Sequence, residues 1–276
     1  MHHTEEMLMN ILVCIKQVPD TTAIKIDPVK HTLIRDGVPS IVSTFDAYAL
    51  EVASRMKDKD KQSRITVISM GPEQAKNALK ECLSKGADEA YLISDRVFGG
   101  SDTLATSYIL SSAILSLEEK NGAPFDLIFC GKQAIDGDTG QVGPEIAQHL
   151  DRALLTYASD AVMEDGKLKV KRESDEGYDY LTADLPAVIT VVKTAFDPRY
   201  PSLKGKMMAN KAVIPTLTFQ DLPNIDPAKC GLKGSPTKVR GTFTPTHEKN
   251  GQKIEAESGE EAGRTLVSLL QKAKLI

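Results

Sequence analysis

Residues 125–145 read FDLIFCGKQAIDGDTGQVGPE, a short apolar run followed by a long polar stretch. The apolar run, residues 125–130, has the pattern of a parallel strand that is buried on both faces. The polar stretch contains four glycines and two aspartates, and a helix is expected to follow it. In an open parallel sheet, ligands lie beyond the carboxyl ends of the strands. This stretch therefore predicts both the fold class and the first place to look for a ligand.

The chain before this stretch repeats the same alternation of strand and helix. Short apolar runs at residues 10–15, 65–69 and 90–93 are expected to be strands. Ser43-Thr44, Gly71-Pro72 and the Gly-Gly-Ser-Asp run at 99–102 each offer a helix start before residues with helical apolar spacing. This alternation predicts an α/β fold, a mainly parallel sheet with helices on both faces.

The pattern changes after about residue 150. Asp165-Gly166 is a hairpin signal, and further strand-like runs follow at 178–182 and 187–193. Prolines and lysines then dominate up to residue 235, and Ser258-Gly-Glu-Glu261 is a capping box that opens a last helix. We expect a leader at 1–8, an α/β nucleotide- or flavin-binding domain at 9–195 that includes the hairpin region from about 151, and a partner-docking loop and C-terminal arm with a terminal helix at 196–276.

The composition excludes several classes of function. The net charge of the 276 residues is -4, so no surplus of cations is present to neutralise nucleic acid, and no apolar run is long enough to span a bilayer. The four cysteines are far apart and the five histidines are scattered, which argues against disulfides and metal sites. The N-terminus is acidic and lacks a signal-peptide pattern, so a cytoplasmic protein is expected.

The polar loop is expected to bind a phosphate-bearing ligand. Glycines let a backbone approach a phosphate closely, and the start of the following helix supplies free N–H groups. Neither G-x-G-x-x-G after the first strand nor G-x-x-x-x-G-K-[ST] occurs, so the chain is neither a typical dinucleotide-binding domain nor a P-loop ATPase. The alternative is an ordinary loop between a strand and a helix.

Three stretches in this order resemble the electron-transfer flavoprotein beta subunits. They are Gly-Lys-Gln-Ala-Ile-Asp at 131–136, Ile-Leu-Val-Cys-Ile-Lys-Gln-Val-Pro-Asp at 11–20, and the run from Val170 to Thr190. Asp179 departs from the family pattern, which usually has glutamate or glutamine there, but it keeps the acidic character. The resemblance extends from about residue 9 to the end. It implies a Rossmann-like sheet of the adenine-nucleotide-hydrolase type.

The resemblance also implies a set of cofactor-binding residues. In this family the beta subunit pairs with an alpha subunit that carries the redox flavin, and it holds either AMP or, in the electron-bifurcating branch, a second FAD. Cys14 and Met70 are expected to act through their backbone groups. By position, the family's nucleotide contacts fall on Cys14, Ser43, Thr44, Phe45, Asp46, Met70, Gly131, Lys132, Gln133, Ala134, Ile135, Asp136, Gly137, Asp138, Thr139, Gly140, Gln141 and Val142.

Two features favour FAD over AMP. The loop at 136–143 has small residues where the family's AMP-type subunits tend to be bulkier, which leaves room for a second phosphate and a ribityl chain. Residues 95–106 resemble a stretch of the bifurcating members. The second stretch adds Asp102, Thr103 and Thr106 to the expected cofactor contacts; its alternative interpretation is a simple capped helix. Asp136 and Asp138 are expected to face amide or ribityl donors. No catalytic acid–base pair or metal site is expected, because the flavin supplies the chemistry.

The resemblance predicts a carrier of electrons within a larger complex. NADH would be the donor, and one electron would pass through the alpha-subunit flavin to an acyl-CoA or 2-hydroxy-acid dehydrogenase. The other would go to a low-potential acceptor such as ferredoxin or flavodoxin. Oxidoreductase activity is then expected only together with these partners. The alternatives are a beta subunit with structural AMP and a non-redox adenine-nucleotide-binding protein.

The stretch from Phe196 to Ala209 resembles the family's recognition loop, which docks the partner dehydrogenase through a leucine. Leu203 occupies that position. A single apolar anchor among prolines, lysines and glycine suits a docking hot spot. The alternative is a loop leucine that packs into its own domain.

Overall fold

The computed structural model describes residues 8–20, 25–26, 33–34, 39–241 and 251–276. It divides into two units, residues 1–241 and 242–276, which are described separately. Of the expected leader, only Leu8 is among the described residues.

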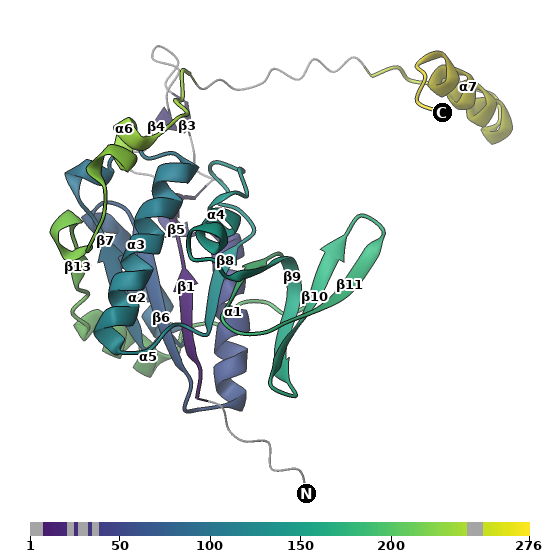
Figure 1. The fold of residues 1–276 in the computed structure, drawn as a ribbon. Helices are drawn as coiled ribbons and strands as arrows, with labels where there is room; N and C mark the ends of the chain where they lie inside the picture. The colour runs from purple at the N-terminus through teal and green to yellow at the C-terminus, as the bar shows by residue number, and fades with distance from the viewer. Residues whose placement is uncertain (1–7, 21–24, 27–32, 35–38, 242–250) are drawn as a thin grey trace, which may run out of the picture. The chain divides into compact units, whose positions relative to one another are not determined.

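A nine-stranded sheet forms the centre of the first unit (Figure 1). Its order is β11-β10-β9-β12-β8-β1-β6-β7-β13. All pairs from β9 to β13 in this order are parallel, and only the β9–β10 and β10–β11 pairs are antiparallel. The predicted α/β class is therefore confirmed. The strands are β1 (Asn10–Cys14), β6 (Arg64–Met70), β7 (Glu89–Ile93), β8 (Leu127–Gly131), β9 (Ala153–Glu164), β10 (Lys167–Ser174), β11 (Gly177–Ala183), β12 (Ala187–Val191) and β13 (Thr216–Leu217).

Two short antiparallel pairs lie outside this sheet. Strand β2 (Gln17–Pro19) pairs with β5 (Ser40–Val42), and β3 (Lys25–Ile26) pairs with β4 (Leu33–Ile34). The first of these pairs leads the chain from β1 into the first helix.

Helices cover both faces of the sheet, because successive residues of each buried strand point to opposite sides. On one face, α1 (Thr44–Lys59) and α2 (Lys76–Ser84) pack on Ile11, Val67 and Phe129. On the other, α3 (Thr103–Asn121) and α4 (Val142–His149) pack on side chains such as Leu12 and Ile128. The near-continuous apolar strands thus supply two cores.

Local capping explains where several elements start and stop. The carboxylate of Asp102 accepts a hydrogen bond from the Ala105 N–H and caps α3. Gly122, with φ 68°, ends that helix in the left-handed conformation. Asp165 and Gly166 both have positive φ and turn β9 into β10, as the hairpin signal predicts.

Residues 192–241 belong to the first unit and pack on its sheet and helices through short elements. Helix α5 (Leu203–Lys211) lies so close to α2 that a Cβ on Gly205 would come 2.6 Å from the Ser84 carbonyl oxygen. Strand β13 covers the outer edge of β7, with the Leu92 N–H donating to the Pro215 carbonyl. The remaining elements are η2 (Glu73–Ala75), η3 (Arg96–Phe98), η4 (Phe219–Asp221), η5 (Pro227–Lys229) and α6 (Gly231–Gly234).

The second unit contains α7 (Gly259–Lys272), which Ser258 caps by accepting from the Glu261 N–H. The Glu261 carboxylate accepts from the Glu257 N–H, one residue before the expected partner of a capping box. No helix among the described residues is long and apolar enough to cross a membrane.

Candidate site at the carboxyl edge of the sheet

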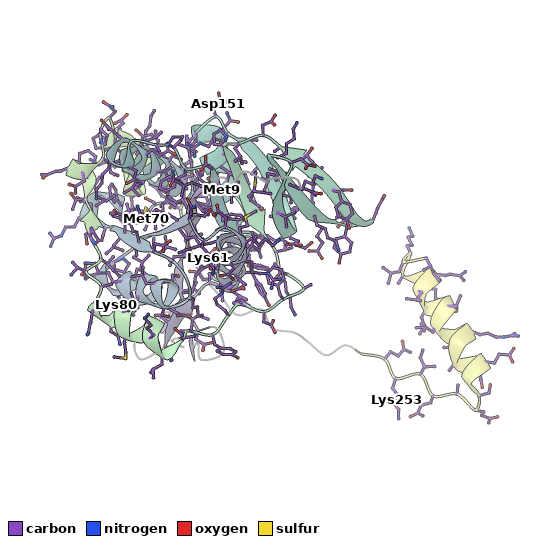
Figure 2. All side chains as sticks on the ribbon, turned by 90° about the horizontal axis from the view of Figure 1, so that it is seen from below. Met9, Lys61, Met70, Lys80, Asp151 and Lys253 are labelled. Carbon is purple, nitrogen blue, oxygen red and sulfur yellow. The ribbon has the colours of Figure 1, made fainter. Side chains whose placement is uncertain are left out.

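The carboxyl ends of the central strands bring three distant parts of the predicted site together. Strands β1, β6 and β8 are neighbours and parallel, so Cys14, Met70 and Gly131 end at the same edge. Met70, labelled in Figure 2, is the last residue of β6. Residues that are more than a hundred positions apart in the sequence therefore contribute to one surface.

Asp46 joins the ends of β1 and β8. Its side chain accepts hydrogen bonds from the Lys16 N–H at 2.7 Å and the Gly131 N–H at 2.9 Å. Burial raises the pKa of this carboxyl to about 7, although both hydrogen bonds oppose the shift. Because both of its oxygens are committed to the protein backbone, Asp46 holds the site's shape.

Gly131 is required for the close approach of β8 to the start of α1. A Cβ at this position would lie 2.7 Å from the Asp46 nitrogen and 2.8 Å from the Phe45 carbonyl carbon. Both of these are backbone atoms, which cannot move aside as a side chain can. The first glycine of the polar loop thus serves packing.

The rest of the loop, residues 132–141, offers backbone donors. The N–H groups of Lys132, Gly137 and Asp138 bond within the chain. Those of Gln133 to Asp136 and Thr139 to Gln141 have no acceptor among the described residues. Gly140 has φ +65°, a conformation that favours glycine. Free N–H groups beside the start of α4 fit a phosphate-bearing nucleotide.

The polar side chains of the loop are partly paired with one another. Asp138 accepts from the amide of Gln133 at 2.7 Å, and Asp136 forms an ion pair with Lys16 at the same distance. Lys16 was not among the predicted site residues. Its position two residues after the end of β1 is the signal that would have identified it, because ligands lie beyond the carboxyl ends of the strands in such sheets.

The start of α1 and the strand ends also bury polar groups. The Ser43 hydroxyl is fully buried and has no hydrogen-bond partner among the described residues, whereas Thr44 is exposed and Phe45 half-buried. Cys14 and Cys130 lie on adjacent strands, and their mutual hydrogen bond and burial raise the pKa of the Cys14 thiol. The buried Ser43 hydroxyl is thus a polar group at this edge that no described residue satisfies.

The additional residues on α3 contact the loop and the chain's later segments. The Thr103 hydroxyl lies 3.0 Å from the Gln141 side-chain oxygen, so α3 and the polar loop are joined. One carboxylate oxygen of Asp102 accepts the hydrogen bond that caps α3, and the other accepts hydrogen bonds from the N–H and the hydroxyl of Thr237. Thr106 is half-buried one turn further along the helix. Asp102 therefore caps α3, and its expected contact with a cofactor stays a prediction.

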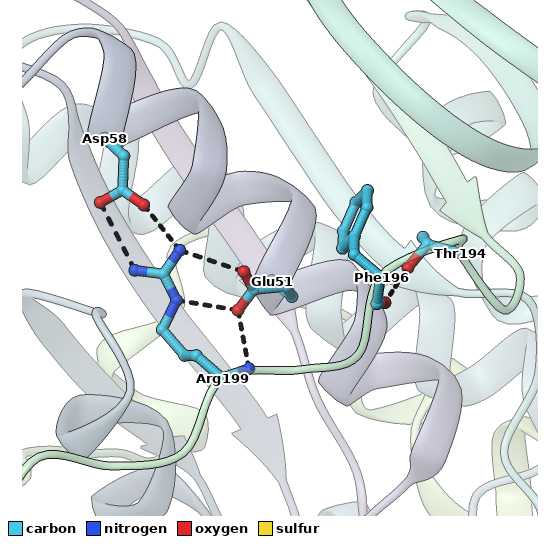
Figure 3. Close-up of polar contacts among 5 residues, drawn as sticks. All are labelled: Glu51, Asp58, Thr194, Phe196 and Arg199. Atoms are coloured by element: carbon cyan, nitrogen blue, oxygen red, sulfur yellow. Dashed lines mark hydrogen bonds and ion pairs between the residues drawn. The ribbon is translucent and has the colours of Figure 1, made fainter.

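The segment before α5 is clamped to α1 by Arg199 (Figure 3). The Arg199 guanidinium donates hydrogen bonds to both carboxylate oxygens of Glu51 and to the carboxylate of Asp58. The backbone N–H of Arg199 also donates to Glu51, at 3.0 Å. The Phe196 ring lies against the Arg55 guanidinium, 4.0 Å from ring centre to Cζ. The clamp fixes the start of the predicted docking segment on a buried helix.

Leu203 is the first residue of α5 and is 78% exposed. The sequence suggested a loop, but Ser202 caps a helix here by accepting from the Gly205 N–H. Met207 and Met208 are exposed beside Leu203, and a groove on α5 is lined by these three residues with Lys204 and Lys211. The alternative of a leucine packed into its own domain does not fit this exposure.

A cavity of about 130 Å³ lies at the opposite, amino edge of the sheet. Its charged residues are paired with one another or with neighbours: Arg64 with Glu89, and Asp88 with Lys57. The carboxyl edge, with backbone donors left unpaired by the described residues, therefore remains the candidate ligand site. No cluster of metal-ligating side chains occurs within the part of the chain that the structure describes.

Comparison with known proteins identifies the family to which the chain is similar. The family described as "Electron transfer flavoprotein domain" matches residues 30–222. The chain is 52% identical to "Electron transfer flavoprotein subunit beta" of Megasphaera elsdenii, over 92% of this chain and 94% of that protein. It is 45% identical to "Caffeyl-CoA reductase-Etf complex subunit CarD" of Acetobacterium woodii, over 97% of this chain and 100% of that protein. It is 42% identical to "Protein FixA" of Azorhizobium caulinodans, over 86% and 85% of the two chains.

Proposed function

The chain belongs to the electron transfer flavoprotein family as a beta subunit, and from this premise we propose that it holds FAD at the carboxyl edge of its sheet. The observation that carries the proposal is the loop at 132–141, whose free N–H groups lie beside the start of α4. The two phosphates of FAD need more hydrogen-bond donors than the single phosphate of AMP. The small residues Gly137, Thr139 and Gly140 leave space for both phosphates to approach the loop.

In this proposal the residues of the carboxyl edge have different roles. The loop backbone binds phosphate, Gly140 supplies the turn, and Asp46 holds β1 and β8 in place. Lys132 adds positive charge at the loop, whereas the Lys16 ammonium is paired with Asp136. When bound, the flavin supplies redox chemistry; the protein orients it and sets the charge around it. No acid–base residue is needed for this function.

The proposed electron path starts at NADH and passes through an alpha subunit's flavin to a partner dehydrogenase. We place the chain in the bifurcating branch, in which a low-potential acceptor such as ferredoxin or flavodoxin takes the other electron. The name of the Acetobacterium woodii relative refers to a complex with a caffeyl-CoA reductase, which supports an acyl-CoA reductase or dehydrogenase as the partner class. Leu203, exposed on α5, is the proposed anchor for that partner.

Two alternatives bind a nucleotide at the same edge. A beta subunit with structural AMP would need only the phosphate-binding part of the loop. If the chain were a non-redox adenine-nucleotide-binding protein, the exposure of the apolar side chains of α5 would have no explanation. The similarity over residues 30–222 also favours the redox family.

Identification of the bound nucleotide tests the proposal. The chain is purified with its alpha subunit and denatured, and the released nucleotides are separated and quantified. Two FAD per heterodimer are expected. One FAD with one AMP would overturn the FAD proposal, and one FAD with no second nucleotide would overturn the site itself.

Substitution in the loop tests which residues bind the nucleotide. Gly140→Val should empty the site, because valine resists a positive φ and costs about 1–2 kcal/mol there. The nearest atoms to a Cβ at this position are 3.5 Å or more away, so the effect comes from backbone conformation alone. Gly122→Val is the control, because Gly122 also has a positive φ and a Cβ there meets open space, but this glycine ends α3 and lies outside the loop. Full occupancy in Gly140→Val would contradict the assignment.

A further inference from the structure

Tyr157 has an unusual backbone conformation within strand β9. Its φ is +57°, and among the described non-glycine residues with positive φ it is the only one inside a strand. Asp138, Asp151 and Asp165 also have positive φ, but aspartate tolerates this conformation in turns. A bulky aromatic residue in the same conformation costs about 1–3 kcal/mol.

The strain accompanies a β-bulge. Between Ile189 and Val191 of β12, strand β9 advances from Leu155 to Ala158, so it contains one extra residue at this point. Bulges of this kind usually place glycine at the positive-φ position. The freed Tyr157 N–H donates to the Thr190 hydroxyl at 3.1 Å, and Thr190 is almost fully buried. The surrounding structure thus holds a tyrosine where glycine would be relaxed.

The bulge brings the Tyr157 ring to the cofactor edge. Val191, which pairs with the bulge, also pairs with Gly131 and accepts from the Lys132 N–H at 2.7 Å. The Lys132 ammonium lies over the Tyr157 ring, 5.0 Å from its centre. Tyr157 is 41% exposed, so covering the core is not its main contribution. Its position next to Lys132 is what the strained backbone achieves.

We propose that Tyr157 is a positioning residue that holds the Lys132 ammonium at the loop, where the ammonium neutralises the phosphates of the bound nucleotide. The proposal rests on the proposed function, because it requires a phosphate at this loop. A lysine side chain is long and flexible, and a cation–π contact reduces its freedom. An ammonium held in place loses less entropy when the nucleotide binds.

The chain offers a matched control. Lys171 lies over the Tyr178 ring at 3.9 Å, a contact of the same kind. Both residues are on the hairpin strands β10 and β11, outside the loop and the parallel strands that end beside it. Removal of the Tyr178 ring therefore tests the loss of a cation–π contact without any effect on the phosphate site.

The test measures binding of AMP and of FAD to the full chain over a range of salt concentrations. Tyr157→Asn removes the ring but tolerates the positive φ, and Lys132→Met removes the charge. Each should weaken both nucleotides by about three- to tenfold and flatten the salt dependence, because a charge–phosphate attraction is screened by salt. The double variant should be no weaker than Lys132→Met alone, since the tyrosine acts through the lysine. Tyr157→Phe keeps the aromatic ring and should bind both nucleotides as tightly as the wild type.

Several outcomes would overturn the proposal. Tyr157→Asn with unchanged salt dependence, or with effects that add to those of Lys132→Met, shows that the ring does not act through the ammonium. An equal loss in Tyr178→Asn assigns the effect to general destabilisation. If Tyr157→Asn does not fold, the comparison of Tyr157→Leu with Tyr157→Phe decides by the same criteria. A wild-type chain that binds neither nucleotide overturns the proposed function as well, whereas wild-type binding with unchanged variants overturns this inference alone.

Discussion

The carboxyl edge of the sheet and helix α5 reverse the usual inside–outside distribution in opposite ways. At the edge, polar groups such as Ser43 and Asp46 are buried. On α5, the apolar side chains of Leu203, Met207 and Met208 are exposed. Buried polar groups and clustered exposed apolar groups are the informative exceptions in a globular protein. The difference indicates two kinds of recognition, of a small polar ligand at the edge and of a protein surface on α5.

The two regions also differ in what supports them. The edge depends on a backbone contact so close that only glycine fits at position 131. The α5 region depends on an ion-pair clamp, in which Arg199 holds both Glu51 and Asp58. Substitutions at the two supports should therefore separate ligand binding from partner binding.

The largest effect is expected from Gly131→Ala. The new methyl group would collide with the backbone of Phe45 and Asp46 and push β8 away from α1. We expect a loss of about 3 kcal/mol in the free energy of unfolding, together with an empty nucleotide site. Thermal melting measures the loss of stability, and the nucleotide content of the purified variant measures the occupancy of the site. Gly241→Ala, where a Cβ meets open space outside the loop, is the control, and wild-type values in Gly131→Ala would refute the close contact.

A smaller loss of stability is expected from Arg199→Ala. The variant leaves the buried carboxylate of Glu51 without its partner, at a cost of about 2 kcal/mol. Transfer to the dehydrogenase should fall because α5 loses its anchor on α1, while nucleotide affinity remains. Arg264→Ala breaks a fully exposed ion pair and should change melting little. Loss of nucleotide with retained transfer would reverse the assignment of the two regions.

Leu203→Ala should weaken partner binding without a change in the folded protein. Burial of a leucine in a partner's pocket contributes roughly 1.5–3 kcal/mol, so affinity should fall by about one to two orders of magnitude. Electron transfer is measured in a dilution series of the partner, so that other interfaces do not mask the loss. Val213→Ala removes another exposed aliphatic side chain as a control. A lower melting temperature in Leu203→Ala would identify Leu203 as a core residue.

The smallest effect is a pH dependence from Asp46. Its pKa of about 7 lies above the unfolded value, so the native state binds more protons than the unfolded state between these values. Stability must therefore decrease as the pH rises, by about 1.4 kcal/mol between pH 6 and pH 8. Asp46→Asn should flatten this part of the profile. Asp95→Asn is the control: hydrogen bonds from Val97 and Phe219 lower the pKa of Asp95, which confines its effect to acid pH.

The sequence predicted the features that depend on local pattern. Apolar runs such as residues 125–130 became buried strands, and Gly122 ended a helix as its type suggests. The polar loop at 131–142 follows a strand at the carboxyl edge, where ligands bind in such sheets. These predictions needed only neighbouring residues and the rules of parallel sheets.

Contacts between distant residues could not be predicted in this way. The Lys16–Asp136 pair and the Arg199–Glu51 clamp join residues that only the folded chain brings together. The helix at Leu203 was missed because its apolar side chains face outward, so no buried stripe marks it. The positive φ at position 157 could not be predicted, because the residue there is tyrosine and not glycine or asparagine, the residues that usually adopt it.

The pairing of β13 with β7 has a consequence for the synthesis of the chain. Strand β7 ends at Ile93, but the residues that cover its outer edge, Thr216 and Leu217, are translated much later. During that interval a nascent chain with a folded centre would present a bare strand edge, which is a template for pairing with other chains. Ribosome-bound chains that stop before residue 216 should therefore depend on chaperones more than those that extend beyond it.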